Sequence, residues 1–446
     1  MKVRYVQSAC VVIEQAGRRV LCDPWLTDGI YYGSWYHYPP LKFAPEDFAG
    51  VDALYISHVH PDHLDVETLK RLPKSLPVLI HDYEEKFVRR LIEQAGFTRI
   101  QEVPNGGRVE LGGGLALQLF SADNCDPAAC GRFLGCRIPQ PYPRTLQLDS
   151  LAVFQAGRQV AVNANDCPYE LSRGVFYQIL RTYPRVDLLL VGYSGAGEHP
   201  QCFENLDDEA KLAAAAAKRD RFLRQAAQFI DHLKPARVMP FAGRYTLGGR
   251  LARLNRFRGV PELEEVPGEL ASRLPAGCST DLVLLNSGES IDLEQGTVSA
   301  PFTPPDPAAR QRYIDEVLAP KRLAYEGAGR PEPDGTDWTP RLRRARARMR
   351  ARKDTYGYQS DWTLYLDVGQ PHLYRVPFGD GDVERAAPGS EAEPFVRIGL
   401  DPALLHMILN RTAHWNNAAI GSHLRFFRRP DVFERGVYHF LSYLHD

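Results

Sequence analysis

The stretch of sequence that decides the fold runs from Leu54 to Asp65 and reads LYISHVHPDHLD. It begins inside an apolar run, Val51 to Ser57, that is rich in strand-forming residues, so a buried strand is expected to end where histidines replace aliphatic residues. Four side chains of the kinds that bind metals then follow within six residues: His58, His60, Asp62 and His63. The sequence therefore predicts a strand that delivers metal ligands from its end.

The types and spacing of these side chains indicate more than one metal ion. His58 and His60 are two residues apart, so both rings lean to the same side of an extended strand, while Asp62 and His63 lie in the turn that Pro61 opens. Imidazole and carboxylate suit zinc, iron or manganese, and four ligands exceed what one tetrahedral ion needs from a single loop. A lone histidine is more often a packed or solvated side chain, but this pattern directly after a buried strand is improbable by chance.

This motif resembles that of the metallo-β-lactamase superfamily. The resemblance implies that His58 and His60, with a later residue, hold one ion and that Asp62 and His63 hold the other. It also implies an α/β fold, the αββα sandwich of that superfamily. The motif is specific for the fold and says little about the reaction.

The segments around the motif alternate between strands and helices, as an α/β fold requires. We expect helices over Val66–Arg71, Glu84–Gly96 and Asp207–Lys234, and strands over Val78–Ile80, Ile100–Val103, Leu115–Phe120 and Val186–Tyr193. Hairpins are expected where Val3–Glu14 meets Arg19–Cys22, where Leu146–Ala156 meets Gln159–Asn163, and where Asp281–Asn286 meets Ser290–Leu293.

Further acidic residues follow expected strands, where the resemblance implies additional site residues. Asp166 resembles the bridging carboxylate whose two oxygens can each bind one ion. Asp123 and Asp126 stand where the superfamily supplies its next ligand, although acidic residues are also common in loops. Asp23 could steady the metal loop through hydrogen bonds, or it could simply end a strand in an Asp-Pro turn.

Two loops could line a pocket beside these residues. Gly29 to Pro40 carries five aromatic side chains, which could wall a pocket for a ring or sugar or could pack on the sheet. Ser194 to Pro200 is rich in small residues that let backbone approach a ligand, and Glu198 and His199 could reach the site from it.

Four short sequence segments point to one family within this superfamily. They are Asp23–Thr27, Asn163–Cys167, Ser194–Pro200 with Cys202–Phe203, and Pro240–Gly243. They look like the metallo domain of CMP-N-acetylneuraminate hydroxylase and its bacterial relatives, a family implied to be an iron-dependent monooxygenase that uses an N-terminal Rieske domain. The metal ligands implied here are His58, His60, Asp62, His63 and Asp166, with Asp126 where that family has histidine.

The chain departs from that family's pattern. It contains no Cys-x-His pair, so a separate ferredoxin or Rieske protein is expected to donate electrons. Asp126 in place of a histidine enriches the oxygen donors, which favours iron or manganese over zinc. The last histidine of metallo-hydrolases is also missing from the loop after Val238; the narrower family shares this absence, which argues against an ordinary zinc hydrolase.

Composition limits the other function classes. The 446 residues are 44% hydrophobic with a formal charge of -1, so no nucleic-acid partner is expected. Apolar runs such as Val186 to Val191 are far shorter than the ~20 residues of a membrane span, and the N-terminus lacks the apolar core of a signal peptide. Eight cysteines in a chain of this length form no disulfide framework. A cytoplasmic protein without membrane contact is therefore expected.

A proline-rich stretch divides the sequence into three regions. Residues 1–300 are expected to form the metallo-β-lactamase-like catalytic domain, 301–340 a proline-rich linker or lid, and 341–446 a small C-terminal α+β domain. Arg341 to Lys353 holds eight basic residues and no acidic one, which could bind a phosphate or could be a solvated helical face.

Two functions of different classes remain open. In the first, two divalent ions, with iron favoured, activate dioxygen for a monooxygenase that acts on a small polar metabolite such as a sugar nucleotide or natural-product intermediate. In the second, zinc or manganese makes a hydroxide that attacks an ester, lactone, amide or phosphate, and Asp62 or Asp166 orients or deprotonates the water. A non-catalytic variant that only binds a ligand is a third possibility.

Overall fold

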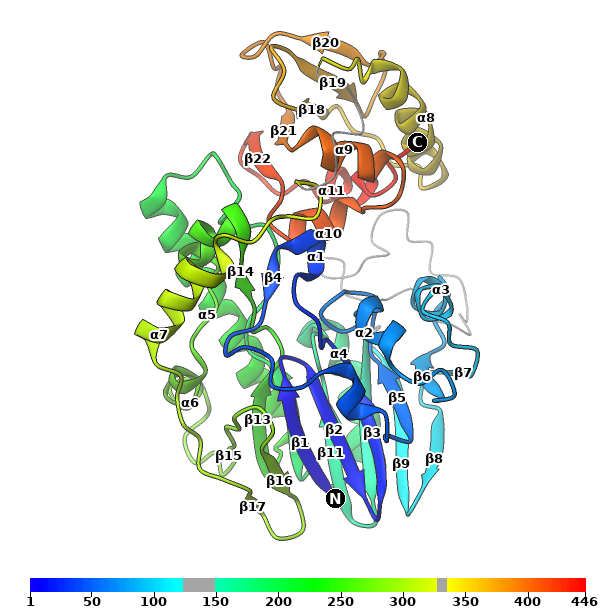
Figure 1. The fold of residues 1–446 in the computed structure, drawn as a ribbon, viewed down its shortest axis with the longest axis vertical. Coiled ribbons are helices and arrows are strands. Elements are labelled where there is room, and N and C mark those ends of the chain that lie inside the picture. Colours follow the sequence, from blue (N-terminus) through cyan, green and yellow to red (C-terminus); the bar gives the residue numbers. More distant parts are fainter. Residues whose placement is uncertain (123–148, 327–334) are drawn as a thin grey trace.

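The computed structural model describes residues 1–122, 149–326 and 335–446, and its larger part is built from two sheets that pack face to face (Figure 1). The first sheet has the order β17-β16-β1-β2-β3-β5-β6-β7. Its strands are β17 (Thr297–Val298), β16 (Ser290–Asp292), β1 (Lys2–Gln7), β2 (Cys10–Gln15), β3 (Arg18–Cys22), β5 (Ala53–Ile56), β6 (Val78–His81) and β7 (Ile100–Val103).

The second sheet has the order β15-β13-β12-β11-β10-β9-β8. Its strands are β15 (Asp281–Leu282), β13 (Arg237–Phe241), β12 (Leu188–Gly192), β11 (Gln159–Asn163), β10 (Ser150–Ala156), β9 (Leu115–Ser121) and β8 (Arg108–Gly112). Alternate side chains of both sheets, among them Tyr5, Ile13, Leu117 and Phe154, meet in one buried core between them.

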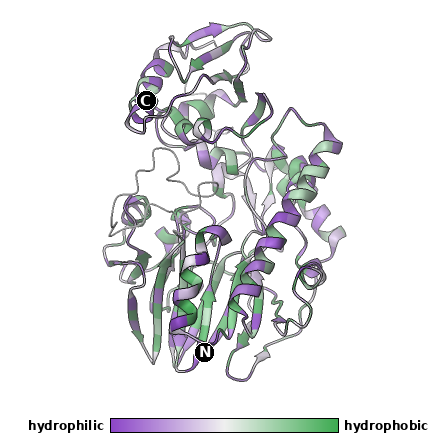
Figure 2. Ribbon diagram, turned by 180° about the vertical axis from the view of Figure 1, so that it is seen from behind, coloured by the Kyte–Doolittle hydropathy of each residue, from purple (hydrophilic) through white to green (hydrophobic). Residues whose placement is uncertain are grey.

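Helices cover the outer face of each sheet. On the first sheet, α2 (Val66–Arg71) and α3 (Phe87–Gln94) contribute residues such as Leu69 and Ile92 to a core with β5 and β6. On the second, α4 (Tyr169–Thr182), α5 (Asp208–Leu233) and α6 (Val266–Ala271) pack against β11, β12 and β13. Figure 2 shows hydrophobic residues gathered on the central strands and hydrophilic residues along the outer helices. The layer order is the expected αββα sandwich.

The C-terminal residues form a second, smaller α+β unit. Its sheet has the order β20-β19-β18-β21-β22, with β20 (Glu384–Ala386), β19 (Leu373–Pro377), β18 (Thr363–Asp367), β21 (Phe395–Gly399) and β22 (Arg425–Arg429). Its helices are α8 (Thr339–Thr355), α9 (Pro402–Leu409), α10 (Trp415–Ile420) and α11 (Arg435–Leu441). The predicted fold class, an αββα sandwich followed by an α+β unit, is thus confirmed.

The two units share a core and a backbone pairing. Phe203 of the first unit stacks on Phe426 of β22 with ring centroids 5.2 Å apart, and Phe426 N donates to Cys202 O at 2.8 Å. Trp25, Trp35 and Trp415 belong to the same buried cluster. The C-terminal unit therefore packs directly on the sandwich, above the edge at which β3, β5 and β11 end (Figure 1).

Two local expectations are wrong. Val3–Glu14 is not one strand, because Ser8 turns the backbone with a φ of 50° and separates β1 from β2. Asp281–Asn286 and Ser290–Leu293 do not form a hairpin, because β15 joins β13 in the second sheet while β16 joins β1 in the first. The connection therefore crosses from one sheet to the other.

The remaining helical expectations agree closely with the structure. α2 and β7 have the expected bounds. α5 begins one residue after the expected start at Asp207, whose side chain caps the helix by accepting from Ala210 N at 2.8 Å. The stretch 301–340, expected as a linker or lid, contains α7 (Pro307–Tyr313) and η4 (Ile314–Leu318). Among the described residues no helix has the length and apolar character to cross a membrane.

The basic stretch Arg341–Lys353 lies on α8, and much of its charge is paired within the unit. Arg344 pairs with Asp446, Arg343 with Asp382, and Arg346 donates to the carbonyl oxygens of Pro377 and Gly379. These contacts favour a structural role for the basic residues of this helix.

The shared core generates a stability prediction. Phe426→Ala removes a fully buried ring that contacts both units, so we expect the free energy of unfolding to fall by about 3–5 kcal/mol in denaturant titrations. The matched control is Phe433→Ala, whose side chain is 62% exposed and should cost about 0.5 kcal/mol or less. Equal losses for the two variants would contradict the packing described here.

Candidate metal centre

The candidate metal ligands gather at one edge of the sandwich, beyond the carboxyl ends of neighbouring strands. The histidine stretch follows β5, Asp23 follows β3, which pairs in parallel with β5, and Asp166 follows β11 of the facing sheet. Gly192, at the end of β12, allows Asn165 to come close, because a Cβ at Gly192 would lie 2.9 Å from Asn165 O. Asp166 is thereby brought to the histidine stretch from more than a hundred residues away.

His63 stands at the centre of the cluster. Its ring is fully buried, and its Nδ1 lies 2.9 Å from Asp23 Oδ2. Its Nε2 makes no well-aligned hydrogen bond with any residue that the structure describes, and it faces Asp166 Oδ2 at 3.4 Å and Asp62 Oδ2 at 3.6 Å. A histidine whose one nitrogen is held by a carboxylate while the other faces oxygen ligands is typical of a metal site.

A second group of ligand atoms surrounds His58. His58 Nε2 lies 3.0 Å from His60 Nδ1 and 3.9 Å from Asp149 Oδ1. The ligand atoms of His58, His63 and Asp166 lie within 4.8 Å of one another, so the two groups of ligand atoms adjoin. The donor set of imidazoles and carboxylates, with an orphaned buried nitrogen at its centre, fits divalent metal ions.

Asp23 supports the cluster from behind. Its buried carboxylate accepts hydrogen bonds from Ser57 N and Ser57 Oγ, each at 2.7 Å, as well as contacting His63 Nδ1. Its backbone has a φ of 44°, a left-handed conformation that few residues other than glycine adopt. Asp23 therefore positions the end of β5 and the His63 ring. This agrees with the interpretation in which Asp23 steadies the metal loop through hydrogen bonds.

The aromatic loop reaches the cluster through Tyr31. Tyr31, on α1 (Ile30–Gly33), donates from its hydroxyl to Asp62 Oδ1 at 2.7 Å. Trp35, on β4 (Trp35–Tyr36), stacks on Tyr245 with centroids 3.6 Å apart. The loop thus both lies beside the cluster and packs in the core.

The electrostatics of the cluster favour neutral imidazoles at His58 and His60. Burial lowers the pKa of both rings, which leaves them uncharged near neutral pH and free to bind a cation. Burial would also lower the pKa of His63, but Asp166, Asp62 and Asp23 outweigh it and raise that pKa well above its ordinary value. Without a bound cation, these carboxylates therefore favour a protonated His63 ring.

The same surroundings also shift the pKa values of the carboxylates. Burial and the charge of Asp166 raise the pKa of Asp149 to about 7. Burial would raise the pKa of Asp166 as well, but His63 and His60 lower it. Four carboxylates crowd three imidazoles here, an excess of negative charge that a cation would relieve.

The other predicted site residues lie elsewhere or outside the described part. Glu198 is near Lys218, and His199 contacts Phe203 and accepts from Lys218 Nζ through its carbonyl oxygen, so the contacts of both are away from the cluster. Asp123 and Asp126 lie outside the described residues.

Sequence reasoning missed three residues at the cluster: Asp149, Tyr31 as a partner of Asp62, and Asn416, whose side chain is within hydrogen-bonding reach of His60. Asp149 could have been found from strand pairing. Ser150 pairs with Ser121, the last residue of β9, so Asp149 lies directly beyond the end of that strand. Asn416 comes from α10 of the C-terminal unit; the polar and aromatic stretch His414–Asn417 could be read as lining a pocket or as capping and packing, but its position at His60 depends on how that unit packs on the sandwich.

Residues 18–146 match the family model of a beta-lactamase superfamily domain. The resemblance to the metallo-β-lactamase superfamily is confirmed. The superfamily fold implies metal ions, and its members among the relatives include both hydroxylases and hydrolases.

Two relatives resemble the chain over about half of its length. A protein from Mycolicibacterium smegmatis, named as a Rieske 2Fe-2S iron-sulfur protein, is 30% identical over 246 residues, which are 54% of this chain and 43% of that protein. The cytidine monophosphate-N-acetylneuraminic acid hydroxylase of Mus musculus is 25% identical over 252 residues, 54% of this chain and 39% of the hydroxylase. The chain thus spans less than half the length of these curated relatives.

Solved structures of this superfamily are more distant. An isothiocyanate hydrolase from Delia radicum gut bacteria is 15% identical with a TM-score of 0.45, covering 66% of this chain and 99% of the hydrolase. CmlA, a diiron β-hydroxylase from Streptomyces venezuelae, is 17% identical with a TM-score of 0.40, covering 64% of this chain and 53% of CmlA. Such low similarity carries no argument about activity.

The position of Asp166 generates a prediction about metal content. Asp166→Asn keeps the size of the side chain but removes its charge, so we expect metal affinity to fall by about tenfold or more. Elemental analysis of the purified proteins, with chelator competition for affinity, measures the effect. Glu198→Gln is the matched control, because it neutralises an acidic residue that lies away from the cluster, and it should keep the metal content of the parent protein. Full metal content in Asp166→Asn would contradict the assignment.

Proposed function

We propose that the protein is a monooxygenase that uses two iron ions and acts on a small polar metabolite, such as a sugar nucleotide or a natural-product intermediate. The observation that carries the proposal is the donor set: His58, His60 and Asp149 on one side, and Asp62, His63 and Asp166 on the other. Carboxylate oxygens equal imidazoles in number among these six ligands, which suits iron better than zinc. The relatives named as hydroxylases and Rieske proteins support the same reaction class.

When bound, a pair of iron ions would supply the electrons that dioxygen needs for insertion of one oxygen atom. The overall reaction consumes the substrate, dioxygen, two electrons and two protons, and it yields the hydroxylated product and water. We propose that a separate ferredoxin or Rieske protein donates the electrons and that the protein acts in the cytoplasm, with residues 1–300 as the catalytic domain, 301–340 as a linker or lid and 341–446 as a C-terminal domain.

The chain's own residues prepare the site for this reaction. Asp23 fixes the His63 ring, and Tyr31 holds Asp62 Oδ1 so that Oδ2 points to the cluster. The Asp166 side chain is 32% exposed and so marks the side from which substrate can approach. Burial of His58 behind it keeps water from the rear of the cluster.

The second candidate is a hydrolase with zinc or manganese. The exposure of Asp166 and the orientation of Asp62 would also let either carboxylate orient or deprotonate an attacking water molecule. An ester, lactone, amide or phosphate would then be the substrate. The same side chains serve both candidates, so the metal decides between them.

Metal identity and dioxygen consumption test the proposed function. We expect protein purified without oxygen and reconstituted with iron to give the Mössbauer signature of coupled iron and, after chemical reduction, to consume dioxygen. Asp166→Asn should lose both properties, whereas Glu198→Gln should retain them. Stoichiometric zinc with no dioxygen consumption would reject the oxygenase and leave the hydrolase.

A further inference from the structure

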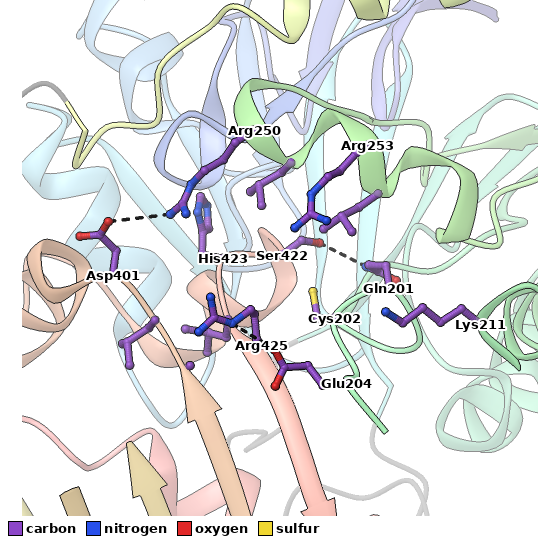
Figure 3. Close-up of a pocket in the computed structure, with 15 residues that line it drawn as sticks. Gln201, Cys202, Glu204, Lys211, Arg250, Arg253, Asp401, Ser422, His423 and Arg425 are labelled. Atoms are coloured by element: carbon purple, nitrogen blue, oxygen red, sulfur yellow. Dashed lines mark hydrogen bonds and ion pairs between the residues drawn. The ribbon is translucent and has the colours of Figure 1, made fainter. Parts of the chain in front are cut away.

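A cavity of about 260 Å³ lies between the sandwich and the C-terminal unit (Figure 3). One wall comes from η2 (Gly249–Phe257) and the residues around Gln201, and the other from the ends of β21 and β22. An apolar protein cavity of about 150 Å³ accommodates benzene, so this one has room for a small organic molecule. Its residues are distinct from the ligands of the candidate metal centre.

The lining of this cavity carries an excess of positive charge. Lys211, Arg250, Arg253 and Arg425 face two carboxylates, Glu204 and Asp401. Two of these arginines are paired: Arg425 lies 3.2 Å from Glu204 Oε1 and 3.3 Å from Asp367 Oδ2, and Arg250 lies 2.9 Å from Glu326 Oε1 and 3.9 Å from Asp401 Oδ2.

The other two cations have no such partner. Neither Lys211 nor Arg253 forms an ion pair within the described ranges 1–122, 149–326 and 335–446, and Figure 3 shows the ends of both pointing toward the cavity. Two cationic groups held apart from carboxylates in a concave wall form a suitable place for an anion.

Gln201 adds a hydrogen-bond acceptor to the wall. Its side chain is only 1% exposed, and its Nε2 donates to Ser422 Oγ at 3.2 Å and to Gly197 O at 2.5 Å. Its Oε1 accepts no hydrogen bond from any residue that the structure describes. A buried amide oxygen without a hydrogen-bond donor lowers the stability of the folded protein by about 1–3 kcal/mol. An O–H or N–H group of a ligand would supply the missing donor.

We propose that this cavity binds a small organic anion, in which a phosphate or carboxylate contacts Lys211 and Arg253 and a hydroxyl or N–H donates to Gln201 Oε1. Charge complementarity and the unsatisfied acceptor both select for such a molecule over a neutral or apolar one. The proposal concerns binding at this cavity and does not rest on the reaction proposed for the metal centre.

A chain of hydrogen bonds leads from this cavity to the metal centre. Arg250 Nη2 donates to Tyr325 OH at 3.2 Å, Tyr325 OH donates to His423 Nδ1 at 2.9 Å, and His423 Nε2 donates to Tyr31 O at 2.6 Å. The direction is set because burial lowers the pKa of His423 to about 4, so the neutral ring accepts at one nitrogen and donates at the other.

Tyr31 completes the path, because its hydroxyl holds Asp62. A ligand that contacts the Arg250 side of the cavity would therefore help to fix the residue that orients a candidate metal ligand. An anion bound in this cavity could be the anionic end of a substrate or a separate effector.

Calorimetric titration of the full-length protein tests the proposal with defined probes. Glycerol 3-phosphate and glycerate carry the two anionic groups together with hydroxyl donors, and glycerol is the neutral counterpart. We expect at least one anion to bind and glycerol not to bind, and the tighter anion identifies the preferred group. Lys211→Ala/Arg253→Ala should raise the dissociation constant by about tenfold or more, because two charge-assisted contacts are lost.

Two controls separate this site from other anion sites. Arg256→Ala removes an exposed arginine from the same η2 segment that pairs with Asp208 outside the cavity, and it should leave binding unchanged. Treatment with a chelator should also leave the binding unchanged, since the site needs no metal. The proposal is overturned if neither anion binds, if the double variant binds as the parent does, or if chelation abolishes binding. None of these outcomes depends on whether the metal centre is an oxygenase.

Discussion

The contact of Asp23 with His63 and Ser57 holds together the part of the molecule on which its chemistry depends. A buried carboxylate is stable only when its oxygens are well satisfied, and here Asp23 is bonded to a backbone N–H, a hydroxyl and an imidazole. These bonds tie the end of β3 to the end of β5. They also turn His63 so that its second nitrogen faces Asp62 and Asp166, which is the arrangement that a metal ion requires.

The C-terminal unit takes part in this arrangement from the other side. His423 donates to the carbonyl oxygen of Tyr31, and Asn416 reaches His60, so residues from its loops and α10 steady both ligand groups. The shared core of Trp25, Trp35 and Trp415 makes the contact rigid. The C-terminal unit therefore contacts the candidate metal centre directly, and a chain of hydrogen bonds joins the cavity beside it to the same residues.

The sequence alone predicted an element or a candidate ligand correctly wherever the pattern that determines it lies within one short segment. The candidate ligands from His58 to His63 follow one apolar strand. The bounds of α2 and β7 were correct because their patterning is local and because Asp65, next to α2, caps that helix. Asp166 was predicted because a hairpin pattern placed it at a strand end and the family resemblance implied a carboxylate there, and the structure brings it within 3.4 Å of His63.

Long-range pairing explains what the sequence did not predict. Asp149 approaches His58 only because β10 pairs with β9, and Asn416 only because α10 packs over the site. The strands β15 and β16 were expected as a hairpin, since adjacent strands usually pair, but each found its partner in a different sheet. Glu198 and His199 follow a buried strand as the clustered candidate ligands do, and only packing shows that they turn toward Lys218 and Phe203.

We propose that imidazoles and carboxylates from distant strand ends gather around a pair of cations. Anomalous X-ray diffraction from crystals of metal-loaded protein would locate these ions. We expect one anomalous peak between His63, Asp62 and Asp166 and a second beside His58, His60 and Asp149. Peaks located elsewhere, or no peak at this edge of the sandwich in protein that contains metal, would contradict this proposal.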